Sequence, residues 1–230
     1  MSCSVLRTSL TYLSLALDPS VINLGSEQDG SQNATAGQSL SITSNNNFIN
    51  TCIGKTITDG KQITSGSCNP TPMGDIPSTD NMPAARFVSP TVGSDVAANT
   101  TFNIVMAVNG MVDGVFTNAQ STYYSAPQQL NGAGQIIGHN HITCQSIPSF
   151  TSTEIPDTKT FAFFKGIDTA AVNGQLTATV TNGLAPGFYR CCSITTTANH
   201  VSVAVPVAQR GSIEDCTMVN YIASVSLCMV

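Results

Sequence analysis

Apolar and polar residues alternate along much of this chain, and the alternation predicts β-strands rather than helices. Between Thr101 and Val108, apolar side chains occupy every second position, at Phe102, Ile104, Met106 and Val108. A period of two places one face of a strand on a core and the other in water. The segments that we predict as strands are Ser39 to Ile42, Thr101 to Val108, His139 to Cys144, Gln175 to Thr181, Gly187 to Ile194, His200 to Val207 and Tyr221 to Leu227.

Dense turn signals separate these strands. Asn-Gly dipeptides supply the positive φ angles that tight turns require, and they begin at Asn109, Asn131, Asn173 and Asn182. Short strands divided in this way predict an all-β fold, a single antiparallel β-sandwich of immunoglobulin-like or jelly-roll-like type. The proline-rich stretch from Cys68 to Pro90 is expected to be a long ordered surface loop. One helical turn is expected around residues 168 to 172.

Composition narrows the classes of partner. Charged residues make up 9% of the 230 positions, and the formal net charge is −5. Nucleic-acid binding needs a clustered basic surface, which eight Lys and Arg residues in total do not provide. No run of residues approaches the ~20 apolar positions of a membrane-spanning helix. We therefore expect no nucleic-acid partner, no membrane span and one domain over residues 17–230.

The amino terminus and two sequons suggest export. Arg7 precedes a short apolar run from Leu10 to Ala16, so residues 1–16 have the pattern of a weak signal peptide. Asn33 and Asn99 each begin an N-x-Thr sequon, which is a glycosylation signal in secreted proteins. These features predict a secreted, extracellular glycoprotein.

Eight cysteines are present, and two of them flank a short turn-rich segment. We expect Cys52 and Cys68 to form a disulfide, which closes a ~15-residue loop and contributes about 3 kcal/mol. Cys191 and Cys192 are adjacent, so on a strand they face opposite ways. Removal of residues 1–16 would leave seven cysteines, so at least one would lack a partner within the chain.

The three histidines of the chain fall in two short motifs. His139 and His141 are two residues apart, so on a strand both rings lie on one face. A third imidazole from His200 would complete a site for zinc, copper or iron with positions left open. Ring nitrogens that converge within about 3 to 4 Å would support such a site, whereas a gap above ~8 Å to His200 would exclude it. The alternative is that the histidines only tie strands and loops together through hydrogen bonds.

Known metal and hydrolase motifs match poorly. Cupins carry an acidic ligand after their H-x-H pair, where this chain has Gln145, and Pro186-Gly187 is not followed closely by a histidine. The Pro-Gly turn instead suits entry into a late strand of an immunoglobulin-like sandwich, with Tyr189 at a sheet edge. Glu214 and Asp215 are neighbours that diverge on a strand, so we interpret them as a solvated turn rather than a glycosidase pair.

Aromatic residues offer a weaker candidate surface. Phe161, Phe163 and Phe164, with Tyr123 and Tyr124, could form a sugar-stacking platform, but a buried strand explains the phenylalanines more simply. The chain has no tryptophan, the ring that stacks most effectively on sugars.

Several motifs together resemble a family of fungal secreted proteins that is widespread in mushroom-forming fungi. The family is often mislabelled in gene catalogues as a small-subunit ribosomal protein. The matching segments are Ile42 to Cys52, Ser65 to Pro70, Ile76 to Pro83, Phe116 to Gln120, Ala126 to Leu130, Gly138 to His141, Phe161 to Gly166, Ala198 to His200 and Pro206 to Gln209. The resemblance implies an extracellular protein of largely unknown activity, with the Cys52 and Cys68 pair and both histidine motifs in the family pattern. Arg210 stands where the family tends to have a histidine, so a four-histidine site is in doubt.

Two functions follow as hypotheses. The first is a secreted fungal surface protein that binds a metal through His139, His141 and His200. The second is a metal-dependent enzyme that acts on a wall polymer or a small secondary metabolite. The enzyme would need a general acid or base beside the metal, for which Glu214, Asp80 and Tyr124 are the candidates.

Overall fold

The computed structural model describes residues 28–44, 50–59, 63–70 and 73–223, and strands dominate this part of the chain. The elements are β1 (Ser67–Asn69), β2 (Gly74–Ile76), the short 3-10 helix η4 (Thr79–Asn81), β3 (Ala84–Ser89), β4 (Asp95–Ala97), β5 (Phe102–Asn109), β6 (Met111–Val112), β7 (Ile136–Ile147), β8 (Phe163–Ile167), β9 (Gln175–Val180), β10 (Gly187–Thr197) and β11 (Cys216–Ile222). The predicted all-β class is confirmed. No helix in the described residues is long and apolar enough to span a membrane.

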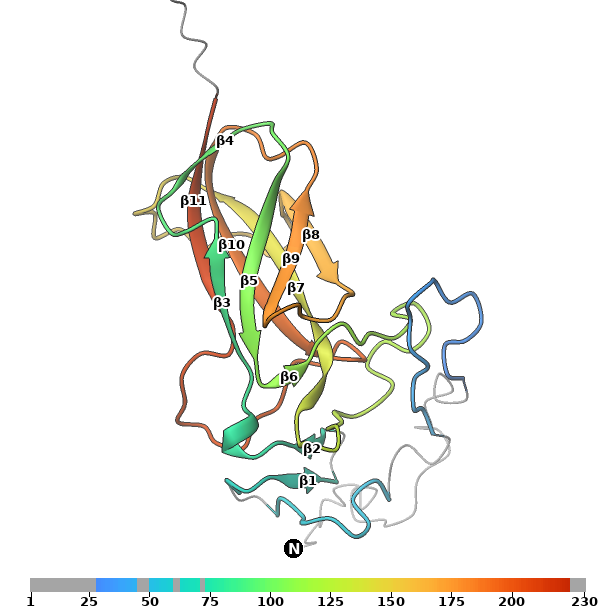
Figure 1. Cartoon of the computed structure of the whole chain (residues 1–230). Coiled ribbons are helices and arrows are strands. Elements are labelled where there is room, and N and C mark those ends of the chain that lie inside the picture. Colours follow the sequence, from blue (N-terminus) through green and yellow to red (C-terminus); the bar gives the residue numbers. More distant parts are fainter. Residues whose placement is uncertain (1–27, 45–49, 60–62, 71–72, 224–230) are drawn as a thin grey trace, which may run out of the picture.

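All of these strands except β1 and β2 form two facing sheets. The larger sheet has the order β4-β11-β10-β7-β6, with β8 paired to the same β7, and the smaller has the order β3-β5-β9. Figure 1 shows β3, β5 and β9 lying in front of β7, β10 and β11, which is the arrangement of a β-sandwich. Two pairs, β4 with β11 and β6 with β7, are parallel, whereas the other pairs of the two sheets are antiparallel.

The core lies between the two sheets and follows from the alternation of the sequence. In β9 every second residue is buried, because Leu176, Ala178 and Val180 face inward while the polar residues between them face water. Ile104 and Met106 of β5 are also fully buried in this core. The opposite sheet contributes Ile142, Cys144, Ile167, Tyr189, Cys191, Val219 and Tyr221.

Two disulfides link three adjacent strands of the large sheet. Cys191 of β10 bonds Cys144 of β7, and its neighbour Cys192 bonds Cys216 of β11. Each pair lies directly opposite in the strand register. The adjacent cysteines do face opposite ways, since Cys144 and Cys191 are buried in the core and Cys216 is exposed.

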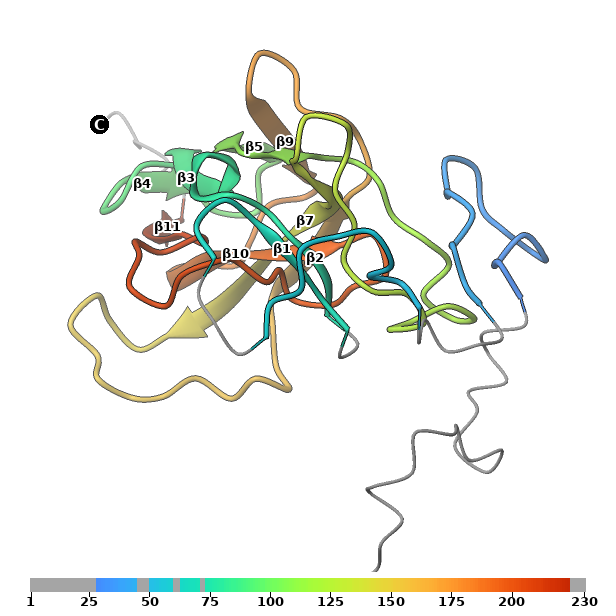
Figure 2. The ribbon, with the colours of Figure 1, turned by 90° about the horizontal axis from the view of Figure 1, so that it is seen from below.

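A third disulfide, Cys52–Cys68, lies at one end of the sandwich, as the sequence predicts. It fixes the chain before β1, which pairs with β2 in a small separate sheet (Figures 1 and 2). Residues 1–27 and 224–230 lie outside the described part, so the pairing of Cys3 and Cys228 is not defined by it.

Several sequence-based expectations are wrong in detail. Residues 39–42 are not a strand, 201–207 contain only a bridge from Ser202 to Thr196, and 168–172 form no helical turn. The last strand in the described residues is β11, which begins at Cys216 rather than Tyr221, and residues 224–227 of the predicted strand lie outside the described part. Tyr189 is buried in a central strand rather than placed at a sheet edge.

The proline-rich stretch is also different from its prediction. Residues 68–90 are not one long loop, because most of β1, η4, β2 and β3 fall within them. Pro70, Pro77 and Pro83 lie between these short elements, and β3 is an edge strand. A proline cannot donate a ladder hydrogen bond, so it interrupts strands without preventing short ones.

Candidate metal centre

Strand β7 places two imidazoles on the outer face of the large sheet. Ile142 and Cys144 of β7 point into the core, so His139 and His141 point to the opposite face. Their ring centroids are 4.7 Å apart. The side-by-side arrangement expected from the H-x-H spacing is therefore present. Gly166 of β8 pairs with His141 and leaves the ring without a side chain across from it.

A tight turn after β10 carries His200 to this pair. Thr196 lies opposite His139 in the register, and the chain then reverses through hydrogen bonds from Thr197 N to Val201 O and from His200 N to Thr197 O. His200 has a φ of 68°, a left-handed conformation that is uncommon for residues other than glycine. Its ring centroid lies 4.6 Å from that of His139 and 5.6 Å from that of His141.

Gly138 allows the close approach of β7 and β10 next to the site. A Cβ atom at this position would collide with the carbonyl oxygen of Thr196 and would lie 2.9 Å from the Cα of Thr197. A side chain would therefore force the two strands apart. This is the physical reason for a glycine immediately before the histidine pair.

The segment from Gly114 to Ser125 joins the two histidine motifs. Val115 O contacts His139 Nδ1 at 3.1 Å, and Thr117 N donates to Ala198 O. Tyr124 N donates to Asn199 O, while the Asn199 side-chain amide donates to Thr122 O and Ser41 Oγ. Asn199 is 2% exposed, so this residue of the Ala-Asn-His motif is a buried anchor that holds the turn.

The three histidines can hold a metal ion. One ring nitrogen from each lies within 4.8 Å of the other two, which is wider than the 3 to 4 Å expected of bound ligands but far inside the ~8 Å that would exclude a site. A tetrahedral ion with bonds near 2.0 to 2.1 Å needs nitrogens about 3.4 Å apart, so small side-chain rotations would complete the site. His139 Nδ1 donates to the Val115 carbonyl when it carries the proton, which leaves Nε2 as the ligand atom.

His200 supplies an independent indication of a ligand. Its Nδ1 atom is buried and has no hydrogen-bond partner among the residues that the structure describes. A buried polar atom without a partner costs roughly 1 to 3 kcal/mol. A metal ion between the three rings offers a compensating interaction at this residue.

The environment keeps all three rings neutral. Burial, with the neighbouring histidines, lowers the pKa of His139 to about 3. Burial lowers the pKa of His141 to about 4, and it lowers the pKa of His200 as well. A neutral imidazole has a free lone pair, which is the form that binds metals. The proton thus competes weakly for these ligands at neutral pH.

Aromatic side chains border the histidines. Phe164 of β8 meets His141 edge to face at 5.0 Å between centroids, and Tyr123 lies 5.6 Å from His200. Tyr123 stacks on Tyr124 at 4.1 Å, and Phe164 contacts Phe161 at 5.7 Å. The buried-strand interpretation of the phenylalanines holds only for Phe163, which packs against the core.

The other sequence-based candidates have structural partners elsewhere. Glu214 Oε1 accepts from Thr195 N and lines a separate cleft with Arg210. Asp215 Oδ2 accepts from Phe87 N, so this carboxylate connects the two sheets. Gln145 shares the histidine face of β7, but its amide donates to the carbonyls of residues 157 and 160. Asp80 belongs to η4, whereas Tyr124 stacks on Tyr123, whose ring contacts His200.

A buried polar network behind the histidines was not expected from the sequence. Asn140 lies between His139 and His141 but faces inward, where its amide donates to Asp113 Oδ1 and accepts from Thr195 Oγ1. Burial raises the pKa of Asp113. The alternation of β7 could have placed Asn140 on the core face, but its partners come from β10 and the end of β6, which only the fold brings together.

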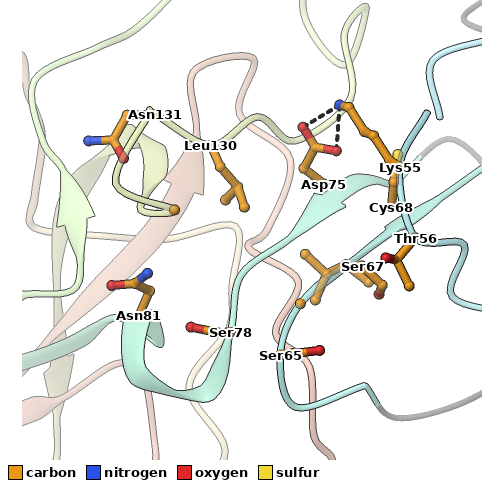
Figure 3. Close-up of a pocket in the computed structure, with 13 residues that line it drawn as sticks. Lys55, Thr56, Ser65, Ser67, Cys68, Asp75, Ser78, Asn81, Leu130 and Asn131 are labelled. Carbon is orange, nitrogen blue, oxygen red and sulfur yellow. Dashed lines mark hydrogen bonds and ion pairs between the residues drawn. The ribbon is translucent and has the colours of Figure 1, made fainter. Parts of the chain in front are cut away.

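Another cleft, distinct from the one lined by Glu214, lies near the small sheet and away from the histidines. Hydroxyl and amide side chains line it, among them Ser65, Ser78 and Asn131, and Lys55 forms an ion pair with Asp75 at 2.7 Å (Figure 3). Among the described residues that line the cleft, Lys55 and Asp75 are the charged ones, and they pair with each other. It shares no lining residue with the histidine site.

Comparison with known proteins places the chain in a family. A model described as the CLU5d N-terminal domain matches residues 85–221, which is more than half of the chain. The chain belongs to the CLU5d family. The matched region contains both histidine motifs and the cysteines of β7, β10 and β11. It begins after the Cys52–Cys68 disulfide and the small sheet.

One curated relative agrees with this placement. The chain is 48% identical over 204 residues to pathogenicity cluster 5 protein d of Colletotrichum graminicola, and the match covers 88% of this chain. It covers 42% of the relative, so the chain spans less than half of that protein's length. The resemblance to a fungal protein family, expected from the motifs, is confirmed at this level.

Proposed function

We propose that this CLU5d-family protein binds a divalent metal ion through His139, His141 and His200. The observation that carries the proposal is the convergence of three neutral imidazoles within 4.8 Å, with the buried His200 Nδ1 lacking a hydrogen-bond partner among the described residues. Three ligands leave at least one coordination position for water or another molecule. The hydrogen bond between His139 Nδ1 and the Val115 carbonyl resembles the hydrogen bonds that orient metal-binding histidines in other proteins.

The donor set favours zinc or copper over iron. Imidazole suits all three metals, but non-haem iron sites characteristically add a carboxylate to two histidines. Glu214 and Asp215, the adjacent carboxylates that the sequence offered, accept hydrogen bonds from backbone groups elsewhere. Copper(II) generally binds nitrogen ligands more tightly than zinc does, so we expect Cu²⁺ to bind more tightly than Zn²⁺.

We further propose that the protein acts outside the cell. Three disulfides suit an oxidising compartment. Residues 1–16 would be removed as a signal peptide, and residues 17–230 would form one domain. Asn33 and Asn99 are both exposed, as glycosylation would require. That the chain is one of the secreted proteins widespread in mushroom-forming fungi stays a prediction.

A metal-dependent enzyme is the second candidate. The feature that favours it is Tyr123, whose ring contacts His200 and whose partner Tyr124 is exposed at the same edge of the site. A hydrogen bond to Tyr124, with burial, raises the pKa of Tyr123, so its phenol stays protonated at neutral pH. It could donate a proton to a leaving group on a wall polymer or a small metabolite. Turnover of such a substrate by metal-loaded protein, lost on Tyr123→Phe, would establish the enzyme.

Metal titration tests the proposal directly. Protein stripped with a chelator is titrated with CuCl₂ or ZnCl₂ in a calorimeter, and the bound metal is then measured by elemental analysis. We expect one ion per chain. His200→Asn removes a ligand and suits the left-handed backbone at this position, so it should abolish tight binding without unfolding the turn.

Gln145→Ala is the matched control, because Gln145 lies on the same face of the same strand. This variant should bind metal as the wild type does. Equal metal content in wild type and His200→Asn would refute the three-histidine site.

A further inference from the structure

The histidine site is bordered by two pairs of exposed aromatic rings that come from different parts of the chain. Tyr123 and Tyr124 lie in the segment between β6 and β7, whereas Phe164 is in β8 and Phe161 lies just before that strand. These side chains are 53%, 58%, 46% and 59% exposed respectively, although each could bury a large apolar area. Clustered exposed aromatics mark binding surfaces rather than ordinary surface positions.

Each pair contacts a different histidine. Tyr123 lies 5.6 Å from His200, and Phe164 lies 5.0 Å from His141, while Tyr124 and Phe161 extend each contact outward. The ring contacts thus run from the tyrosine pair to His200, then to His141, and then to the phenylalanine pair, with the proposed metal ligands in the middle. An elongated molecule that lies along this series of ring contacts would touch both pairs and pass over the metal site.

The backbone at Tyr124 has a strained conformation, although the ring that it carries is exposed. Tyr124 has a φ of 57°, and its N–H donates to Asn199 O in the turn that carries His200. A left-handed conformation at a bulky residue persists only when surrounding structure imposes it, and such strain gathers at functional sites. The same turn thus positions both a proposed ligand and an exposed ring.

The chemistry of the surface favours an uncharged ligand. The rings that contact the histidines from either side belong to Tyr123 and Phe164, whose side chains are uncharged. Flat apolar rings stack on the C–H faces of sugar rings, and a hydroxyl oxygen of a sugar can fill an open metal position. A chain of sugar rings is also long enough to reach two separate platforms.

We propose that this surface binds a neutral polysaccharide, with Tyr123 and Tyr124 stacking on one part of the chain and Phe161 and Phe164 on another. The polymer lies across His139, His141 and His200, so the inference extends the proposed metal function and names its ligand class. The aromatic contacts do not themselves require the metal.

Binding to neutral glycans tests the proposal. Wild-type protein is incubated with insoluble β-1,3-glucan, cellulose or chitin, and the bound fraction is measured against polymer concentration, with soluble oligosaccharides of two to six units as competitors. We expect at least one polymer to bind and the longer oligosaccharides to compete better. No binding to any of these glycans would overturn the proposal.

Variants at the outer ring of each pair locate the surface. Tyr124→Asn removes a ring while tolerating the positive φ, and Phe161→Ala removes the other outer ring, which contacts Phe164 rather than a histidine. Each should weaken polymer binding, and the double variant should weaken it by roughly tenfold or more. Phe150→Ala is the control, because Phe150 is 37% exposed but packs against Phe188 elsewhere. Equal binding by wild type and the double variant would overturn the proposal.

The same proteins separate this inference from the metal function. Metal content and polymer binding are measured on wild type, on His200→Asn and on the double aromatic variant. If the wild type binds polymer but takes up no metal, the aromatic surface is supported and the metal site is rejected. If it binds metal but no polymer, the metal site is supported and the glycan proposal is rejected. Concentration-dependent dimerisation that the aromatic substitutions abolish would overturn the glycan proposal in favour of a protein interface.

Discussion

The rings of His139 and His200 meet nearly edge to face, with 4.6 Å between their centroids and 78° between their planes. His139 comes from a central strand and His200 from a tight turn after the neighbouring strand. The contact exists because Thr196 pairs with His139 in the strand register, so the reversal that follows returns the chain to the same face. One imidazole is therefore held by the sheet and the other by a hydrogen-bonded turn.

Metal should stabilise the folded protein. An ion that binds the native state alone at about 100 times its dissociation constant adds about 2.7 kcal/mol to the free energy of unfolding. For a chain of this size the increase in Tm is roughly 5 to 10 °C, measurable by calorimetry on protein with and without ZnCl₂. MgCl₂ should give no increase, because Mg²⁺ prefers oxygen ligands. An equal increase for His200→Asn would contradict the assignment of His200 as a ligand.

Acid should destabilise the metal-free protein through its histidines. The pKa is about 3 for His139 and about 4 for His141, against 6.5 in an unfolded chain, so the unfolded state takes up more protons below that value. The free energy of unfolding is then highest above pH 6.5 and falls as the pH decreases to about 3, the pKa of His139 in the folded protein. Denaturant midpoints measured in chelator across this range should show the decline.

The histidine origin of this decline has its own control. His141→Asn removes one titrating ring and should flatten the dependence on pH, whereas Gln145→Ala on the same face should leave it unchanged. An identical slope in wild type and His141→Asn would assign the effect to other groups.

Gly138→Ala should disrupt both stability and the site. The added Cβ collides with the Thr196 carbonyl, so β7 and β10 must separate where His139 faces Thr196. Overpacking of this kind costs roughly 1 to 3 kcal/mol, and metal affinity should fall because His139 moves relative to His200. Gly211→Ala is the control, since a Cβ there meets nothing within 4 Å. Urea unfolding and metal titration of the two variants check the expectation.

The two disulfides of the large sheet should differ in how much each contributes to the free energy of unfolding. Cys144–Cys191 closes a sequence separation of 47 residues, and its replacement by two alanines should lower the free energy of unfolding by about 4 kcal/mol. Cys192–Cys216 closes 24 residues, so its loss should cost about 3 kcal/mol. The first pair is also buried in the core, where its removal leaves a cavity. A larger loss for the exposed pair in denaturant titrations would contradict this order.

The sequence predicted many of the strands and turns, because the alternation that marks a strand depends only on neighbouring residues. The strands around Phe102 and Leu176 follow from the apolar residue at every second position. The strand around His139 follows the same period of two, with the two histidines on one face. The positive φ angles at Asn173 and Asn182 likewise follow from turn chemistry in the sequence. The segments around Ser39 and Val203 are not strands, because short apolar runs also occur in loops. Ser39 N donates to Phe116 O in another loop, and residues 201–207 join β10 only through the bridge from Ser202 to Thr196.

The sequence by itself determined an all-β chain, the common face of His139 and His141, the opposite faces of Cys191 and Cys192, and the Cys52–Cys68 bridge. Each of these depends on the spacing of residues within a short segment. Only the tertiary structure decided that His200 reaches the pair, since this requires the pairing of β7 with β10 and a left-handed turn. It also decided which cysteines pair across the sheet and that Tyr123 and Phe164 border the histidines. Contacts between distant segments depend on strand order and register, which no local pattern specifies.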